Sequence, residues 1–589
     1  MKKLKNIFVL SGVILFSAFI SCNEEFLQKP VQGALGDEVL ANKAGVEKLL
    51  VGAYALMDGI GAGNGWEGAP DNWIYGSIAG GDAHKGSFGG DLPAIDPIVK
   101  FIADGSNNFF NIKWKVLYNG VTASNSVLIE LPLAKNILEA DRKNIEAQAR
   151  FLRGHFYFEL KKMFNMVPWI DEATTDFNQP NDVDIWPKIE ADFKFAFDNL
   201  PPIQAQVGRA NKWAAGSYLG KTYLYQKKYS EAIAIFDQVI SEGQTSNGLK
   251  YGLVEKFEDN FDAATKNNKE SVFAIQMTAN NGTNSVGNSN QGGMICFPGG
   301  NAPFRRSGGY HQPSQELVNS YRTDASGLPL VDAYNQAAVK NDMGLLSSEE
   351  FTPDGGNLDP RLDWTVGRRG IPFHDWGYYP GASWVLTQSY SGPYGPKKNV
   401  YWQATQDIYA DQSSWAPGTA INVLVIRFAD VLLMAAEAHA NAGSLVKAQE
   451  YVNLVRARAA NKVCWLNDYK DPKKPLDGFS NLPAANYVIS IYPAGYFDGI
   501  GKDRALKAIY FERKLELAME GHRFFDLVRW GIAETALNNY FNYEGTIVTD
   551  IRGGKFMKGR SEYYPIPNSQ IDLSKTPNGF LLKQNPGYN

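Results

Sequence analysis

Apolar residues recur every fourth position in several stretches of the chain, which is the spacing of amphipathic helices. Between residues 149 and 164, the residues Leu152, Phe156, Leu160 and Phe164 form one apolar stripe. Pro168 follows this stripe and predicts that the helix ends before it. Two further helices are predicted, from Gly45 to Met57 and from Asp503 to Trp530.

A more specific pattern runs from Trp213 to Ile240, where small and large residues follow the spacing of a tetratricopeptide repeat. Leu219, Gly220, Tyr223, Tyr229, Ala232 and Phe236 occupy its positions. In this motif small residues let two antiparallel helices approach, and large residues fill the space between them. A weaker copy runs from Val431 to Ala459. Because such helix pairs bury their faces only by stacking, we predict a helical superhelix.

Three long segments between the helical blocks are rich in Gly, Asn, Ser and Pro, which are turn and loop residues. These segments are residues 59–90, 279–309 and 354–418, and Ser271–Thr278 reads as a short strand beside one of them. Loops of this length usually carry function. The predicted fold is therefore mostly α, a tetratricopeptide-like superhelix with large loop-rich inserts and few short strands.

The first residues predict where the protein is found. Lys2, Lys3 and Lys5 precede an apolar run from Ile7 to Ile20, which is too short to span a membrane and is typical of a secretory signal. The run ends at Cys22, and this arrangement resembles a bacterial lipoprotein signal over residues 1–21. In such proteins the Cys is diacylated and becomes the new N-terminus. The alternative is plain secretion with an incidental Cys22.

Composition excludes several classes of function. A formal net charge of −4 over 589 residues gives no electrostatic footprint for nucleic acid. The six histidines form no local metal motif, so no metal and no cofactor are expected. Residues 81–87 (GDAHKGS) lack the Lys that closes a phosphate loop, and no carboxylate pair stands out for glycoside hydrolysis. Cys296 and Cys464 either form one bridge or remain buried free thiols, and the second reading is favoured.

Aromatic residues are concentrated in the third loop segment. Twelve lie within 52 residues: Trp364, Phe373, Trp376, Tyr378, Tyr379, Trp384, Tyr390, Tyr394, Tyr401, Trp402, Tyr409 and Trp415. The first loop segment adds Trp66, Trp73 and Tyr75 beside Asp71, Asn72 and Asp82. A flat ring packs against the C–H face of a sugar, while neighbouring polar groups bind its hydroxyls. We expect most of these rings to anchor loops and at least one to be an exposed platform.

The stretch from Glu512 to Gly531 combines many charges with apolar residues on one predicted helix. Buried charges persist only when they are paired, and this stretch offers many pairs. We therefore interpret it as a structural network that joins this helix to its neighbours, in preference to a functional site.

Five stretches resemble the signature blocks of the SusD/RagB family. They are Val425–Ala438 (VIRFADVLLMAAEA), Tyr451–Ala459 (YVNLVRARA), Glu512–Gly531 (ERKLELAMEGHRFFDLVRWG), Tyr563–Leu573 (YYPIPNSQIDL) and Gln584–Tyr588 (QNPGY). The resemblance implies an N-terminal region at 22–240 with tetratricopeptide-like helices and a C-terminal region at 268–589 with a loop-rich ligand face. It also implies a surface-exposed lipoprotein of the outer membrane that is not an enzyme.

By the same resemblance, the protein would act as a lid on a SusC-like, TonB-dependent β-barrel transporter and capture an oligosaccharide for import. The alternative is a peptide-capture subunit on the same scaffold, and a surface glycoside hydrolase is a more distant one. Family members bind ligands through the loop after the first helices and through loops of the C-terminal half. The candidate ligand-binding residues in those regions are Trp66, Trp73, Asp82, Arg305, Arg306, Arg368, Trp376, Tyr378 and Trp384.

Overall fold

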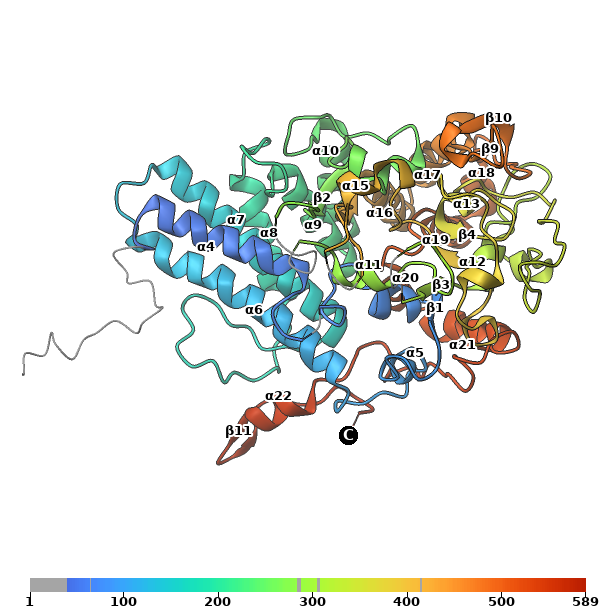
Figure 1. Ribbon diagram of the computed structural model, residues 1–589. Coiled ribbons are helices and arrows are strands. Elements are labelled where there is room, and N and C mark those ends of the chain that lie inside the picture. The colour runs from blue at the N-terminus through green and yellow to red at the C-terminus, as the bar shows by residue number, and fades with distance from the viewer. Residues whose placement is uncertain (1–39, 64, 283–287, 305–307, 414–415, 589) are drawn as a thin grey trace, which may run out of the picture.

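Consecutive helices stack into a curved array that forms one half of the molecule (Figure 1). The computed structural model describes residues 40–588 except 64, 283–287, 305–307 and 414–415, so the predicted signal and Cys22 lie outside the described residues. Each helix of the array packs on the next, and α4 covers α6 and α7. The bounds are α4 Lys43–Ala55, α6 Asn108–Glu130, α7 Glu139–Phe164, α8 Trp186–Asn199, α9 Lys212–Tyr225 and α10 Tyr229–Glu242.

Glycines on the contacting faces set the spacing of these helices. A Cβ added at Gly220 of α9 would lie 2.5 Å from the ring of Phe236 in α10. The same pairing of Gly with Phe recurs between α6 and α7 at Gly120 and Phe156, where the distance would be 2.3 Å. The predicted exchange of small and large residues is therefore the physical basis of the packing.

The array continues across a long insertion, because α10 packs directly against α16. Helices α16 (Phe428–Asn441) and α17 (Leu445–Ala460) form the second predicted helix pair, and α19 (Lys502–Glu516) packs on α16. The smaller helices are α5 Ile95–Val99, α11 Gln291–Ile295, α12 Gln315–Ser320, α13 Arg361–Thr365, α14 Gln388–Ser391, α15 Gln406–Tyr409, α18 Tyr496–Ile500, α20 Arg523–Arg529, α21 Ala533–Glu544 and α22 Asn568–Leu573. The predicted fold class, mostly helical with large loop-rich inserts, is confirmed.

The strands of the described chain are short and pair only in twos. Strand β2 (Ser271–Ile275) pairs antiparallel with β8 (Val423–Arg427), so the beginning and the end of the longest insertion are held side by side. The predicted strand at 271–278 is present but ends at Ile275. The other pairs are β1 Ala83–Gly86 with β3 Tyr310–Pro313, β4 Val366–Gly367 with β5 Gly395–Pro396, β6 Ala410–Asp411 with β7 Gly418–Thr419, β9 Asn467–Tyr469 with β10 Phe479–Pro483, and β11 Lys575–Thr576 with β12 Gly579–Phe580.

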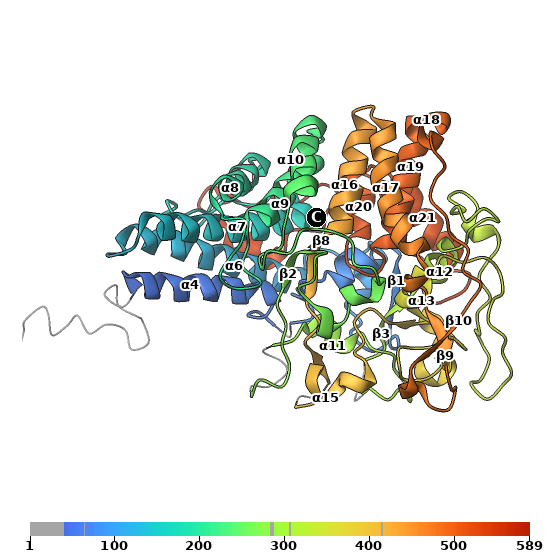
Figure 2. The same cartoon turned by 90° about the horizontal axis from the view of Figure 1, so that it is seen from above.

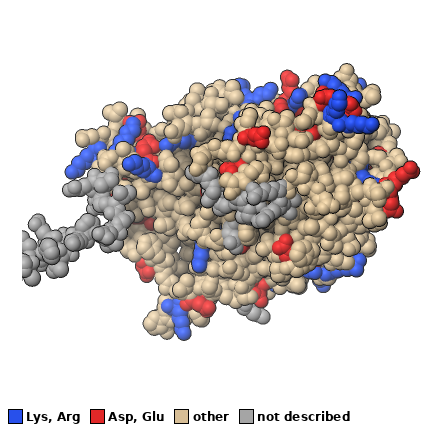
Figure 3. All heavy atoms as spheres, in the orientation of Figure 1, with Lys and Arg blue, Asp and Glu red and all other residues tan. Residues whose placement is uncertain are grey.

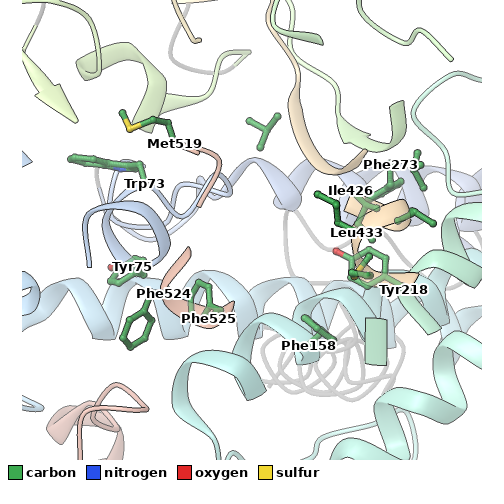
Figure 4. Packing of buried hydrophobic residues seen from close by; sticks show 14 of the residues in the cluster. Trp73, Tyr75, Phe158, Tyr218, Phe273, Ile426, Leu433, Met519, Phe524 and Phe525 are labelled. Carbon is green, nitrogen blue, oxygen red and sulfur yellow. The ribbon is translucent and has the colours of Figure 1, made fainter. Parts of the chain in front are cut away.

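Two hydrophobic cores and a small third cluster of Ala263, Ala420 and Ile421 lie beneath this arrangement in the described part of the chain. The main core runs through the helical array and includes Trp73, Phe158, Tyr218 and Phe524 (Figure 4). A smaller one, here called the loop core, consists of Phe297, Phe304, Phe373, Tyr379, Val400, Tyr401 and Ala410. Seen from above, α11, α15 and the β9–β10 hairpin lie on the side opposite α10, α16 and α17 (Figure 2). The insertions therefore form a loop-rich layer with a core of its own.

The predicted single helix from Asp503 to Trp530 is wrong in one respect, because α19 ends at Glu516 and α20 begins only at Arg523. Between them Met519 and Gly521 adopt positive φ angles of 66° and 77°. A Cβ at Gly521 would lie 2.0 Å from the carbonyl oxygen of Asp71, so the turn packs against the first loop segment. This contact between distant segments interrupts the helix.

The charged residues of this stretch form a buried structural network, as predicted. Glu516 accepts hydrogen bonds from Arg361 at 2.8 Å and from Arg427 at 2.5 Å, and it also pairs with Arg458. Arg361 also binds Asp359 and Glu512. The side chains of Glu516 and Arg361 are completely buried. Cys296 and Cys464 are free and buried, which confirms the favoured reading.

Candidate ligand-binding site

Two half-buried tryptophans lie at the edge of the loop core. Trp376 and Trp384 meet the buried ring of Phe304 edge to face, with ring centroids 5.0 and 5.8 Å away. Trp384 also packs edge to face on Phe373 and Tyr379. Each indole therefore has one side fixed by the loop core and part of its surface open to solvent.

A tight turn between Ile371 and Tyr379 holds Trp376 in place. The amide of Phe373 donates to the carbonyl of Gly377 at 2.9 Å, and the amide of Tyr379 donates to that of Ile371 at 3.0 Å. Gly377 has a φ of 100°, which favours glycine at this position. The Trp376 indole N–H donates to the carbonyl of Tyr401 at 2.9 Å. Because the indole N–H is already bonded to the protein, the solvent-exposed part of the Trp376 ring is available for apolar contact with a ligand.

Tyr378 lies next to the β9–β10 hairpin. Its hydroxyl donates to the carboxylate of Asp468, and its ring meets Tyr469 edge to face at 5.2 Å. Burial and then the Asp468 carboxylate raise the pKa of Tyr378 to about 12. Tyr469 in turn stacks on Phe479 at 5.3 Å. Sequence reasoning missed this hairpin, since its strands are too short for an alternating pattern and its rings lie outside the dense aromatic segment.

Trp73, Asp82 and Arg368 are buried, which prevents their side chains from contacting a ligand at the surface. Trp73 donates its indole N–H to the carbonyl of Trp66 at 3.1 Å and lies next to Met519 in the main core (Figure 4). Asp82 accepts from the amide of Met519 at 3.0 Å, and burial raises its pKa to about 6. Arg368 is paired with Asp363 at 2.9 Å. Trp73 and Asp82 therefore anchor the first loop segment, and Arg368 anchors the third.

The structure does not bring all candidate residues together. Trp66 is half-buried but packs against the main core, whereas Trp376 and Trp384 pack against the loop core. Arg305 and Arg306 lie outside the described residues, although they directly follow Phe304 in the chain. Trp364, Tyr394 and Tyr401 are buried anchors, as expected for most of the rings.

The charges on the visible face do not form a broad region of one sign (Figure 3). Lysines gather over the β9–β10 hairpin, where Lys470, Lys473 and Lys474 are exposed, but Asp477 lies among them. Among the described residues no group of three His, Cys, Asp or Glu side chains could hold a metal ion. None of the helices in the described part of the chain combines the length and the apolar character needed to cross a membrane.

This geometry can be compared with known proteins. A family profile described as the SusD family matches residues 269–588, which is more than half of the chain. This chain belongs to the SusD family. A second profile, described as "Starch-binding associating with outer membrane", matches residues 99–224 of this SusD-family protein. SusD-family proteins bind ligands and do not catalyse reactions, so the protein is not an enzyme.

Relatives extend the likeness over nearly the whole SusD-family chain. SusD-like protein P25 of Formosa agariphila is 24% identical over 557 residues, covering 90% of each chain. The solved structure of a laminarin-binding SusD-like protein has a TM-score of 0.63 at 24% identity, covering 93% of this chain and 100% of that one. Surface glycan-binding protein A from Bacteroides thetaiotaomicron, in complex with laminarihexaose, has a TM-score of 0.62 at 19% identity. The match covers 92% of this chain and 98% of that one.

Proposed function

We propose that this protein is a glycan-capture lipoprotein of the cell surface, in which Trp376, Tyr378 and Trp384 form the sugar-binding face. The observation that carries the proposal is the placement of the half-buried rings of Trp376 and Trp384 around Phe304, each fixed on one side and open on the other. Tyr378 lies two residues after Trp376 in the chain and is also half-buried. Arg305 and Arg306 directly follow Phe304 in sequence and remain candidate hydroxyl-binding groups of the proposed site. Solved SusD-like relatives that bind laminarin and laminarihexaose support a glycan as the ligand.

The expected affinity follows from the area of the rings. One sugar face removes roughly 100 Å² of apolar surface from water, worth about 2.5 kcal/mol at ~25 cal/mol per Å². Association and ordering offset several kcal/mol of this gain. Two or three rings with a few hydrogen bonds then give a Kd between about 1 mM and 1 μM. Such binding is weak enough for the oligosaccharide to be released to an import protein.

Calorimetry with laminarihexaose, preceded by a glycan array, tests the proposal on the mature chain. Trp376→Ala and Trp384→Ala should each weaken binding about tenfold, since each removes about 1.4 kcal/mol or more of stacking. Trp186→Ala is the matched control, because this half-buried ring lies at the start of α8 in the helical array. Unchanged affinity in both loop variants would remove these rings from the site. Binding of peptides in place of any glycan would favour the peptide-capture function, and shortening of the glycan would contradict capture without catalysis.

We also propose that the protein is anchored through lipidated Cys22 in the outer membrane and acts as the lid of a SusC-like β-barrel transporter. The family profile that names association with the outer membrane supports this location. Gentle detergent extraction should recover the protein together with the barrel, since stable interfaces bury more than about 1,000 Å². Cys22→Ala should abolish partitioning into detergent. A mature N-terminus at another residue, without an acyl group, would contradict the anchor, and isolation alone from membranes that contain the barrel would contradict the lid.

A further inference from the structure

A cavity of about 330 Å³ lies between the end of α4 and strand β2. One wall is formed by Val51 and Tyr54 of α4 with Met57 just beyond it, and the facing wall by the turn at residues 206–209. Ile275 and Met277 form a third side. The cavity shares no residue with the proposed glycan site and is lined mainly by apolar side chains.

Two charged side chains lie on the cavity wall, and only one of them is paired with an opposite charge in the described part of the chain. Arg209 is paired with Glu47 at 3.0 Å and donates to Gln206 at 2.7 Å. Asp58 accepts one hydrogen bond, from the amide of Ile60 at 2.8 Å, and forms no ion pair with another described residue. Burial raises the pKa of Asp58 to about 6, and only the amide of Ile60 opposes that rise. Asp58 therefore lines the cavity without a counter-ion in the described part of the chain.

The chemistry of the walls selects among possible ligands. An anion would be repelled by Asp58, and a neutral apolar molecule would take water from the carboxylate without replacing its hydrogen bonds. Cavities of about 150 Å³ admit benzene, so 330 Å³ admits an aromatic ring with a short side chain. A positively charged group on an apolar body satisfies both the carboxylate and the apolar wall.

We propose that this cavity binds a small organic cation, a primary ammonium group on an aromatic or aliphatic body, with Asp58 as its counter-ion. This site is additional to the glycan site and does not depend on the proposed function. The ammonium group donates to the free oxygen positions of Asp58, while Met57, Met277 and Val51 contact the apolar body. Thioether side chains adapt readily to ligands of different shape.

Calorimetry on the mature chain at neutral pH tests the proposal with three probes of similar shape: phenethylamine, 2-phenylethanol and phenylacetate. The amine should bind about tenfold or more tightly than the alcohol, because both donate a hydrogen bond to the carboxylate but only the ammonium group adds the attraction of opposite charges. Phenylacetate should bind least. Asp58→Asn keeps an acceptor for the amide of Ile60 but removes the charge, so it should abolish the preference for the amine.

Asp176→Asn is the matched control, since the exposed Asp176 accepts from the amide two residues later at 2.9 Å, as Asp58 does. It should leave the preference intact. A fourth probe, Nα-acetyl-lysine methylamide, carries the lysine side chain as it occurs in a polypeptide. Its affinity relative to phenethylamine distinguishes a polypeptide lysine from a free amine as the natural ligand. Equal affinity for amine and alcohol, or a preference that survives Asp58→Asn, would overturn the proposal, as would binding of none of the amines.

Discussion

Gly220 and Phe236 show how one missing side chain sets the distance between two helices. Both could be singled out from sequence, because their spacing lies within one helix pair. Trp73 could not be placed in the same way. Its burial depends on Gly292, Tyr310 and Met519, which are distant in sequence. A tryptophan in a Gly-rich segment looks the same in sequence whether it faces solvent or the main core.

Gly220→Ala should lower the free energy of unfolding by about 1–3 kcal/mol, because its Cβ would overlap the Phe236 ring. Gly52→Ala in α4 is the control. A Cβ at Gly52 meets nothing within 4 Å, so the higher helix propensity of Ala should raise stability by up to about 1 kcal/mol. Urea denaturation measures both variants. Equal effects of the same sign would contradict the packing argument.

His84 should make stability depend on pH in the alkaline range. Burial alone would lower the pKa of His84, but Asp550 at 3.2 Å and Glu544 at 3.1 Å outweigh it and raise the pKa to about 10. Because the folded pKa exceeds the unfolded value of about 6.5, this contribution is full below pH 6.5 and disappears as the pH rises through 10. His84→Gln should therefore be less stable than the parent at pH 6.5, and the gap should narrow by pH 10. A gap that stays constant over this range would show that His84 is not charged in the folded protein.

At the scale of secondary structure elements, the sequence predicted the charged network better than the helix that carries it. The pairs of Glu512, Glu516 and Asp526 were expected because the stretch contains both signs in close spacing. The break between α19 and α20 was not expected, since the apolar spacing continues through it. The positive φ angles of Met519 and Gly521 arise from packing against Asp71, a contact that no local pattern encodes.

Glu516→Gln should destabilise the protein by about 3–5 kcal/mol, because it leaves buried guanidinium groups of Arg361, Arg427 and Arg458 without their shared carboxylate. The control is Asp198→Asn, which breaks an exposed pair with Lys194 at 2.8 Å. That change should cost about 0.5 kcal/mol or less. Thermal and urea unfolding provide the measurement, and similar losses in the two variants would be the contrary result.

At the scale of the whole molecule, the fold could be predicted because the residues that pack within a helix pair lie close together in sequence. The candidate site could not be placed fully. Trp376 and Trp384 were identified by the density of rings in the third loop segment, and Trp73 by its place beside polar residues in the first, but Trp73 is buried. What separates these residues is which core they join. That division is a property of the folded chain, in which the loop core and the main core have no member in common.

The two cores should open independently. Phe297→Ala removes a buried ring that packs on Phe304 at 5.6 Å and Tyr401 at 5.8 Å within the loop core. Amides between residues 371 and 401 should then exchange hydrogen faster, while those of α7 keep their protection, since local opening follows local packing. Hydrogen exchange with mass spectrometry measures this. Faster exchange in α7 to the same extent would mean that the two cores unfold as one.

The antiparallel pair β2–β8 has a consequence for how such proteins diversify. It holds the two ends of the longest insertion side by side, so a loop between them can change length without separating those ends. Lengthening a loop closed in this way is inexpensive, because each doubling adds only about 0.6 kcal/mol of closure entropy. Mutation and recombination can therefore reshape the ring-bearing segments while the scaffold stays intact. A lineage could acquire a new nutrient by altering the surface loops of the insertion while its buried anchors stay in place.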